Sequence, residues 1–390
     1  MNTKVMLETT WRRRQWLFSR LRPRHVWNYL LGGLGFVLKR ERVSNWPAVV
    51  KIDISPICNL RCTVCVHADP NGRDMLARQE FAPGHKMSVE QFRRIIDEIR
   101  GRTATVSLYT WGDPMTHPDL DEMCRIAHEA GLQVHISTNF SFKLKDERIR
   151  SLVESGLSHL TVCVDGLSQQ KYEKTRVGGR IEWVLDNLRR VLETRRALGR
   201  EFPKVEVQFI KFQHNVDELE AARKLTSELG VEEFADFWGA LHNYADREPE
   251  LYETLGPRPN RALPQCYWPH FSMVIKYDGD VIPCCEHRMA AQHMKGGDAR
   301  VFGNVFRTSV AEVWNGEEYR KARRIVSNPE VVNAEPELRK HFCDGCFVIF
   351  DTTIAKNARW ANAHAWEEVF APDERGRPVR RPSEETGLPA

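Results

Sequence analysis

Between residues 48 and 237, the pattern of hydrophobic and polar positions alternates between two periods. Short runs rich in β-branched residues, typical of buried strands, occur at 48–54, 104–109, 133–137, 159–164, 204–212 and 231–237. Between them, apolar residues recur at helical spacing over about 88–99, 119–130, 146–155, 181–199 and 216–229. Strand and helix in series predict an α/β fold with a parallel sheet and right-handed crossovers. A doubly wound sheet fits this periodicity as well as a barrel does.

Local signals mark several of the predicted helix ends. A capping box formed by Ser88 and Gln91 begins the first helix, and apolar residues then recur on one side of it. Gly131 and Gly230 follow the second and fifth helices, where glycine commonly ends a helix. These end signals therefore support the helices predicted from the hydrophobic pattern.

The first 46 residues differ in composition from the rest of the chain. They carry ten Lys or Arg against two Glu, interleaved with aromatic and aliphatic residues at roughly helical spacing. The pattern fits an interfacial helix that makes peripheral contact with an anionic membrane or a partner. It also fits a helical extension packed on the following domain, with a solvated basic face. Gly32, Gly33 and Gly35 are expected to weaken a continuous helix here.

The second half of the chain begins with a stretch rich in Asp, Arg, Glu, Pro and Gly, which reads as a linker. A β-hairpin is predicted over 273–282, and the Pro-rich charged tail from Ala371 is predicted to be disordered. The predicted divisions are a basic extension, a βα domain, a linker, a small α+β domain, and a C-terminal helix with its tail, at 1–46, 47–243, 244–262, 263–350 and 351–390.

Charge and cysteine content narrow the class of protein. A formal net charge of +4 over 390 residues is too small for a dedicated nucleic-acid-binding protein. Seven of the ten cysteines fall into two spaced groups, which differs from the disulfide framework of a small secreted domain and favours metal binding in a reducing compartment. Neither a secretory signal nor a run of about 18 apolar residues is evident. We therefore expect a cytoplasmic protein.

The first cysteine group lies directly after the first predicted strand. Cys58, Cys62 and Cys65 are spaced Cys-x3-Cys-x2-Cys on one short loop, so their thiolates can face a common point. Three thiolates are one fewer than an iron–sulfur cube has irons, which leaves one coordination position open for chemistry. A structural zinc site is normally closed by four protein ligands. A loose zinc knuckle or a set of buried thiols is the alternative.

This spacing after a strand resembles the radical S-adenosylmethionine (radical SAM) enzymes. The resemblance implies a partial (βα)6 barrel, similar to a TIM barrel, with its reactive groups at the carboxyl ends of the strands. It also implies a 4Fe-4S cluster whose open iron binds S-adenosylmethionine, and reductive cleavage of that cofactor to a 5'-deoxyadenosyl radical. Many members carry an aromatic residue before the third cysteine, where this chain has Val64.

Two further motifs follow at strand ends in the order the family has them. Trp111-Gly112-Asp113-Pro114 resembles the Gly-Gly-Glu-Pro motif, whose backbone contacts the methionyl amine, with Trp and Asp as departures. Gly112 permits close backbone approach. After the third strand, Ser137, Thr138 and Asn139 are suited to a ribose diol, or form an ordinary N-cap or Asx turn.

Arg176 follows the fourth strand within the run Tyr172 to Gly179. In the similar subfamily, an Arg at the matching position pairs with the carboxylate of S-adenosylmethionine, and a planar guanidinium suits that partner. The alternative is a surface arginine at a helix cap. Cys124 and Cys163 have no spacing partners and are expected to be small buried residues.

Substrate is expected where the last two barrel strands end. Gln208 breaks an apolar strand face, and Trp238, His242 and Asn243 follow the sixth strand. They are candidates for substrate contact or proton transfer, His242 because its ordinary pKa lies near neutrality. A solvated loop histidine is the alternative.

The second cysteine group comprises Cys266, Cys284, Cys343 and Cys346. The predicted hairpin brings Cys284 back toward Cys266, and Cys-x2-Cys supplies two more thiolates, so four close one site. Zinc on four thiolates has the same spacing. The layout resembles the twitch domain, a shortened SPASM domain, which implies one auxiliary 4Fe-4S cluster. Cys285 adjoins Cys284 and is the alternative ligand.

These resemblances imply a radical SAM oxidoreductase of biosynthesis. The expected substrate is a hydroxylated small molecule such as a sugar or aminocyclitol, with the auxiliary cluster accepting an electron and a reductase, flavodoxin or ferredoxin as donor. Epimerisation would need a thiol, for which Cys285 or Cys163 is the candidate. Peptide maturation and a non-catalytic iron–sulfur protein are the other hypotheses.

Overall fold

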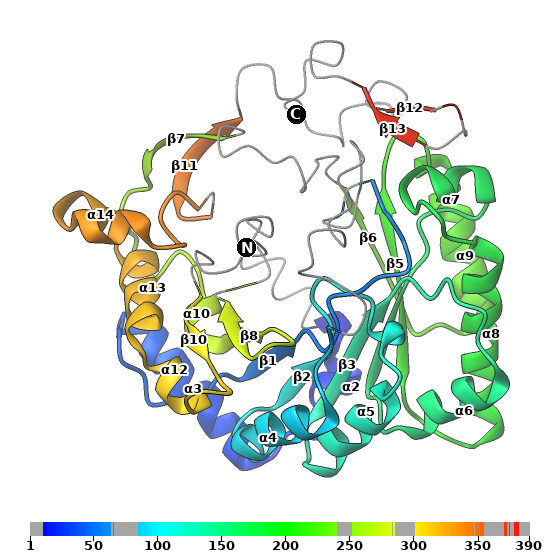
Figure 1. Ribbon diagram of the computed structural model, residues 1–390, viewed down its shortest axis with the longest axis horizontal. Coiled ribbons are helices and arrows are strands. Elements are labelled where there is room, and N and C mark those ends of the chain that lie inside the picture. The colour runs from blue at the N-terminus through cyan, green and yellow to red at the C-terminus, as the bar shows by residue number, and fades with distance from the viewer. Residues whose placement is uncertain are drawn as a thin grey trace.

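A nine-stranded sheet forms the centre of the computed structural model (Figure 1), with strand order β10-β9-β8-β1-β2-β3-β4-β5-β6. The structure describes residues 11–63, 65, 85–239, 252–282, 284, 301–346, 348–354, 370–372, 374 and 378–381. Six neighbouring strands pair in parallel in chain order, as the periodicity predicts. They are β1 (Val49–Ile52), β2 (Thr105–Ser107), β3 (Gln133–Thr138), β4 (His159–Cys163), β5 (Lys204–Lys211) and β6 (Glu233–Trp238).

The helices between these strands distinguish a barrel from a doubly wound sheet. Figure 1 shows them along the outer side of a curved sheet, whereas a doubly wound sheet carries helices on both faces. The partial barrel is therefore confirmed. The helices are α4 (Val89–Ile99), α5 (Leu120–Glu129), α6 (Asp146–Glu154), α7 (Gln169–Thr175), α8 (Ile181–Ala197) and α9 (Leu219–Leu229), with short 3-10 turns η2 (Pro114–Thr116) and η3 (Val216–Glu218).

The predicted hairpin is present, and it extends the barrel sheet. β8 (Ser272–Ile275) pairs antiparallel with β9 (Asp280–Ile282), and β9 pairs with β10 (Gly303–Asn304). β8 also lies parallel to β1 over its whole length. Helices α12 (Val310–Trp314), α13 (Glu317–Ser327) and α14 (Val331–Ala334), and the 3-10 turn η5 (Pro336–Lys340), complete this region.

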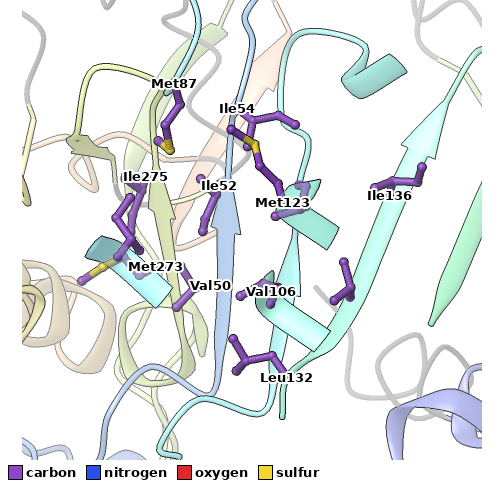
Figure 2. Close-up of a cluster of buried hydrophobic side chains, with 14 of the residues drawn as sticks. Val50, Ile52, Ile54, Met87, Val106, Met123, Leu132, Ile136, Met273 and Ile275 are labelled. Atoms are coloured by element: carbon purple, nitrogen blue, oxygen red, sulfur yellow. The ribbon is translucent and has the colours of Figure 1, made fainter. Parts of the chain in front are cut away.

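One hydrophobic core joins the barrel to the hairpin region. Figure 2 shows buried side chains of β1, β2, β3 and β8 lying together, namely Val50, Ile52, Val106, Ile136, Met273 and Ile275. Burial of such aliphatic side chains contributes roughly 1.5–3 kcal/mol each. The cysteine loop after β1 and the hairpin that leads to Cys284 are therefore held on one rigid body.

The structure corrects two predictions in the second half of the chain. The predicted linker contains β7 (Tyr252–Pro257), which pairs with β11 (Phe350–Ile354). In the tail predicted to be disordered, β12 (Phe370–Pro372) pairs with β13 (Pro378–Arg380). Composition describes a whole segment and does not detect a pairing of a few residues. The predicted C-terminal helix falls mainly on residues outside the described part.

The N-terminal extension also differs from its prediction. After α2 (Arg14–Leu17), the helix α3 (Pro23–Val37) runs without a break through the three glycines that were expected to weaken it. A Cβ atom on Gly32 would lie 2.8 Å from the Phe271 ring, and one on Gly35 would lie 3.1 Å from Val43. The glycines therefore permit close packing of α3 on the domain, which offsets their low helix propensity.

Residues 11–17 close the amino-terminal end of the barrel. Trp16 is buried and stacks on His159 of β4, with ring centroids 4.7 Å apart. Arg13 donates to the buried Glu206 carboxylate of β5 at 2.7 Å, and Arg12 donates to it at 3.0 Å. Burial alone would raise the pKa of Glu206, but the two guanidinium groups lower it to about 2. Part of the extension is thus packed on the barrel.

Replacing Arg13 with leucine is expected to destabilise the protein by about 3 kcal/mol at neutral pH, because Glu206 stays buried with one partner fewer. The Glu206 pKa lies below its ordinary value of 4.5, so its contribution is complete above that pH and is lost as the pH falls toward 2. Urea unfolding should therefore show a gap between wild type and variant that narrows in acid. Arg14→Leu, which removes a half-buried guanidinium that lies over Trp11 and does not contact Glu206, is the matched control. Equal losses in both variants would contradict this account.

Among the described residues, no helix combines the length and the apolar character needed to cross a bilayer.

Candidate active site at the carboxyl ends of the barrel strands

The first cysteine group lies on the loop that leaves β1. Cys62 is buried, and Cys58 and Cys65 are half-buried. Their thiols lie close enough to influence one another electrostatically. No three His, Cys, Asp or Glu side chains in the described ranges converge tightly enough to hold a single ion. A cube of four irons places each thiolate on a different iron, so three thiolates on one loop would leave the fourth iron without a protein ligand.

Hydrogen-bond donors surround the sulfur atoms of this loop. The Leu60 N–H and the Asn139 amide lie 3.4 and 3.7 Å from Cys58 Sγ, and Arg176 Nη1 lies 3.9 Å from Cys62 Sγ. Burial raises the pKa of Cys62 to about 11, while Arg176 opposes the shift. A bound iron would favour the thiolate form, and the donors would then stabilise its charge. The three cysteines and their neighbours thus fit an iron–sulfur cluster.

The turn after β2 packs directly on the cysteine loop. A Cβ atom on Gly112 would lie 1.9 Å from the Ser55 carbonyl oxygen and 2.6 Å from that of Ile57. The Asp113 N–H donates to Ile57 O at 2.9 Å. On the other side, the Trp111 N–H donates to the Asp53 carboxylate at 3.3 Å. Only glycine at position 112 allows the turn after β2 to pack this closely on the backbone of the cysteine loop.

Asp113 connects this turn to the end of β3. Its buried carboxylate accepts from the Met115 N–H, from the Thr138 hydroxyl at 2.9 Å, and from both the N–H and the amide of Asn139 at 2.7 and 2.6 Å. Burial raises the Asp113 pKa to about 6 against these donors. The Asn139 amide also donates to Asn59 in the cysteine loop at 2.9 Å.

This network gives the side chains of the second and third motifs partners within the protein. The Thr138 hydroxyl donates to Asp113 and accepts from the Phe140 N–H. We therefore propose that Asp113, Thr138 and Asn139 position the cysteine loop. Ser137 is half-buried, and its hydroxyl lies beside Cys163 at the end of β4. We propose Ser137 as the residue of this motif that contacts the cofactor ribose.

Arg176 lies in the interior, at the end of α7. Its Nε donates to the buried Asp165 carboxylate at 2.6 Å, and its side chain is 14% exposed, which excludes the surface alternative. Asp165 also accepts from the Ile210 N–H at 2.7 Å and so ties Arg176 to β5. The guanidinium is held next to Cys62. This is where the proposed carboxylate of S-adenosylmethionine would need a partner.

The residues predicted to meet substrate are only partly described. Gln208 is half-buried in β5, and its backbone carbonyl accepts from the Val164 N–H. Trp238 ends β6, with the Lys211 ammonium 5.4 Å from its ring centroid. Both lie on strands whose carboxyl ends share the cysteine-loop edge of the sheet. His242, Asn243 and Cys285 lie outside the described residues.

The second cysteine group lies on the β8–β9 hairpin region and on the segment after η5. The thiol of Cys343 interacts electrostatically with those of Cys346 and Cys266, and burial raises its pKa. Tyr319 of α13 lies near both Cys284 and Cys343. Its buried hydroxyl has no hydrogen-bond partner in the described part of the chain, as expected of a donor that faces a sulfur-rich group. These residues fit a second cluster.

Sequence reasoning missed three residues here. Asp53, Asp165 and Tyr319 are all buried, and each touches a predicted motif. Burial raises the pKa of Asp53 to about 7 against the backbone donors of the turn after β2. An acidic residue within two positions of the end of a buried parallel strand was the available signal for Asp53 and Asp165. No sequence signal indicated Tyr319, because its contacts are distant along the chain.

A curved parallel sheet with two separated cysteine groups defines a βα-barrel enzyme that carries iron–sulfur clusters. The radical SAM superfamily matches residues 52–197, and the iron–sulfur cluster-binding SPASM domain matches residues 266–347. The chain therefore belongs to the radical SAM enzymes with a SPASM-type domain, as the cysteine spacing predicts. The first domain implies a 4Fe-4S cluster and S-adenosylmethionine, and the second implies an auxiliary iron–sulfur site.

Known relatives agree with this family and differ in activity. The chain is 24% identical over 210 residues to the AdoMet-dependent heme synthase of Methanosarcina barkeri, covering 54% of this chain and 55% of that protein. It thus spans about half the length of that relative. It is also 24% identical to a tungsten-containing aldehyde ferredoxin oxidoreductase cofactor-modifying protein of Pyrococcus furiosus, covering 71% and 83%.

A solved structure shares the fold. SuiB of Streptococcus suis, bound to S-adenosylmethionine, has a TM-score of 0.53 and 16% identity, covering 80% of this chain and 75% of its own. The same protein bound to its precursor peptide SuiA also has a TM-score of 0.53, covering 74% and 69%. At this identity the likeness establishes the fold alone.

Proposed function

We propose that this radical SAM enzyme oxidises a hydroxyl group of a sugar, aminocyclitol or similar small molecule to a carbonyl. The observation that supports the proposal is the proximity of Cys343 to Cys346 and Cys266, with Tyr319 near both Cys343 and Cys284. Four thiolates on one auxiliary cluster would leave no position for substrate. When bound, the cofactors supply hydrogen-atom abstraction at the carbinol carbon and an acceptor for one electron, while the hydroxyl proton passes to a base. The substrate thus loses two hydrogens and becomes a ketone or aldehyde.

Residues of both cysteine groups and of the barrel strand ends have distinct proposed roles in this reaction. Cys58, Cys62 and Cys65 would hold the first cluster, and Cys266, Cys284, Cys343 and Cys346 the auxiliary cluster. Arg176 would orient the cofactor carboxylate, since Asp165 fixes its guanidinium. The Gln208 amide can both donate to and accept from substrate hydroxyls. His242 is the proposed base for the hydroxyl proton.

The charged groups around Trp238 lie on the face of the sheet that α9 covers, because Arg223 belongs to that helix. Lys211 is paired with Asp236 at 2.6 Å, and Arg223 reaches the same carboxylate at 2.8 Å. Both pairs are partly exposed at the end of β6. Gln208 pairs with Ala235 and points to the opposite face, so Gln208 is the better supported of the two proposed substrate contacts.

Peptide maturation is the second candidate. It is favoured by the precursor peptide bound to SuiB, which shares the fold. Epimerisation is a variant of the first proposal, and Cys163 at the end of β4 is the described thiol that lies near the site. These alternatives make different products from the same initial radical.

The test is a product assay with the anaerobically reconstituted protein, S-adenosylmethionine and dithionite, offered aminocyclitols, sugars or short peptides. We expect 5'-deoxyadenosine formation that depends on a hydroxylated small molecule, and a product lighter by two hydrogens that reacts with hydroxylamine. The variant Cys343→Ala, Cys346→Ala should still cleave the cofactor but lose that product. An inverted product of unchanged mass would instead indicate an epimerase, and stimulation by peptides alone a maturase.

A further inference from the structure

We propose that the outward face of α3 docks this enzyme onto an anionic lipid surface. Eight of the eleven large apolar side chains exposed in the described ranges lie between residues 11 and 38. Scattered exposed apolar residues are normal, but such a concentration on one short segment marks an interaction site. On α3 and its C-cap they are 46–62% exposed, and they are Val26, Trp27, Leu30, Leu34, Val37 and Leu38.

The exposed positions form one face of the helix. At about 100° per residue, the six side chains fall within an arc of roughly 120°. The opposite arc carries His25, Asn28, Gly32 and Gly35, which are buried against the domain. α3 therefore presents its apolar side to solvent and its small and polar side to the protein, the reverse of an ordinary surface helix. Figure 1 shows α3 at the rim of the molecule.

Specific contacts fix this orientation. The Asn28 side chain accepts from the Trp46 N–H at 2.7 Å and donates to Trp46 O at 3.0 Å. Gly32 packs against Phe271 so closely that a rotated helix would bring a larger side chain into that ring. The apolar face is thus turned outward by the same packing that holds α3 to α10 (Trp268–Phe271).

The charge around this face selects an anionic surface. Residues 11–46 carry nine Arg or Lys against one Glu. Arg12, Arg13 and Arg20 are bound to the barrel, whereas Arg22, Arg24, Arg40 and Arg42 are exposed beside the apolar face. Basic residues near an anionic bilayer are attracted to its charge, and exposed Trp and Leu insert at the headgroup boundary. A second copy of this chain fits less well, because pairing two such faces would bring two basic segments together.

This docking is independent of the proposed radical chemistry, so binding can be measured directly on the holoprotein. The reconstituted full chain would be sedimented with vesicles of phosphatidylcholine, alone or with phosphatidylglycerol. We expect binding only to the anionic vesicles and a marked weakening as salt rises from about 0.1 to 1 M. Binding to neither vesicle, or equally to both, would overturn the proposal.

A pair of matched variants tests whether vesicle binding depends on this face of α3 or on exposed apolar side chains in general. Leu34→Glu and Leu263→Glu change side chains of equal exposure, 48% each, at different places in the fold. Leu34→Glu should lower vesicle affinity about tenfold or more, since it removes one inserted apolar side chain and adds a negative charge. Leu263→Glu should bind as the wild type does. Equal affinity of the two variants would contradict the assignment.

A separate measurement tests whether a second copy of the chain, and not a lipid surface, covers this face. Both variants should retain wild-type iron content and unfolding temperature, because both side chains are exposed in the folded protein. Light scattering should show the same molar mass for wild type and Leu34→Glu. A wild-type dimer that Leu34→Glu dissociates would assign the face to a second copy instead, and would overturn the lipid proposal.

Discussion

Replacing Cys58, Cys62 and Cys65 together with alanine is expected to abolish formation of 5'-deoxyadenosine. The three thiols lie within electrostatic reach of one another and are surrounded by N–H donors, so they form a single ligand set whose loss removes the cofactor-binding iron. Anaerobically reconstituted wild type should contain about eight irons, and the variant about four, because the second cysteine group is intact. Iron counting and a nucleoside assay with dithionite measure both effects.

The control for this variant is Cys124→Ala. Cys124 is fully buried in α5, away from both cysteine groups in sequence, and its removal should leave iron content and nucleoside formation unchanged. About four irons in the wild type and none in the triple variant would contradict the prediction. The second site would then hold zinc or nothing, and the electron-acceptor proposal would have to be abandoned.

Gly112→Ala is expected to have the next largest effect. The new methyl group would lie 1.9 Å from a backbone carbonyl oxygen of the cysteine loop, a distance that no side-chain rotation can relieve. The turn after β2 or the cysteine loop must move, at a cost of about 3 kcal/mol. We expect a lower unfolding temperature and loss of the first cluster only, seen as about half the wild-type iron. The absorbance of the reconstituted protein and thermal unfolding measure this.

Gly33→Ala is the matched control for that change. Gly33 lies in α3 beside the buried Gly32, but a Cβ atom on Gly33 would meet nothing within 4 Å. Alanine in a helix is favoured over glycine by about 1 kcal/mol, so this variant should be as stable as the wild type or slightly more stable. Retention of both clusters in Gly112→Ala would show that the loop can relax around the added methyl group.

The strands and helices of the barrel could be predicted because their signals are local. A run such as 133–137 contains its own β-branched pattern, and Ser88 with Gln91 forms the predicted capping box. The cysteine groups could be predicted for the same reason, since ligand spacing within a short loop is visible in the sequence. The structure and the family comparison confirm the barrel and the radical SAM assignment.

What could not be predicted depends on contacts between distant segments. The sequence places Asp113 in a motif expected to bind the cofactor, but the partners of its side chain at the end of β3 are known only once β2 and β3 pair. The continuity of α3 through its glycines depends on Phe271, more than 200 positions away in the sequence. Helix propensity describes an isolated helix and does not include this packing.

The pairing of β1 with both β2 and β8 has a consequence for how such enzymes diversify. β1 is the strand that leads into the cysteine loop, and β8 belongs to the segment that matches the SPASM domain. Cutting the chain between the two matched regions would leave β1 and β8 each with a bare edge, which invites aggregation. A chimera that exchanges the auxiliary region between relatives must therefore carry a compatible β8. Such a chimera is therefore constrained by this strand ladder as well as by the cysteines.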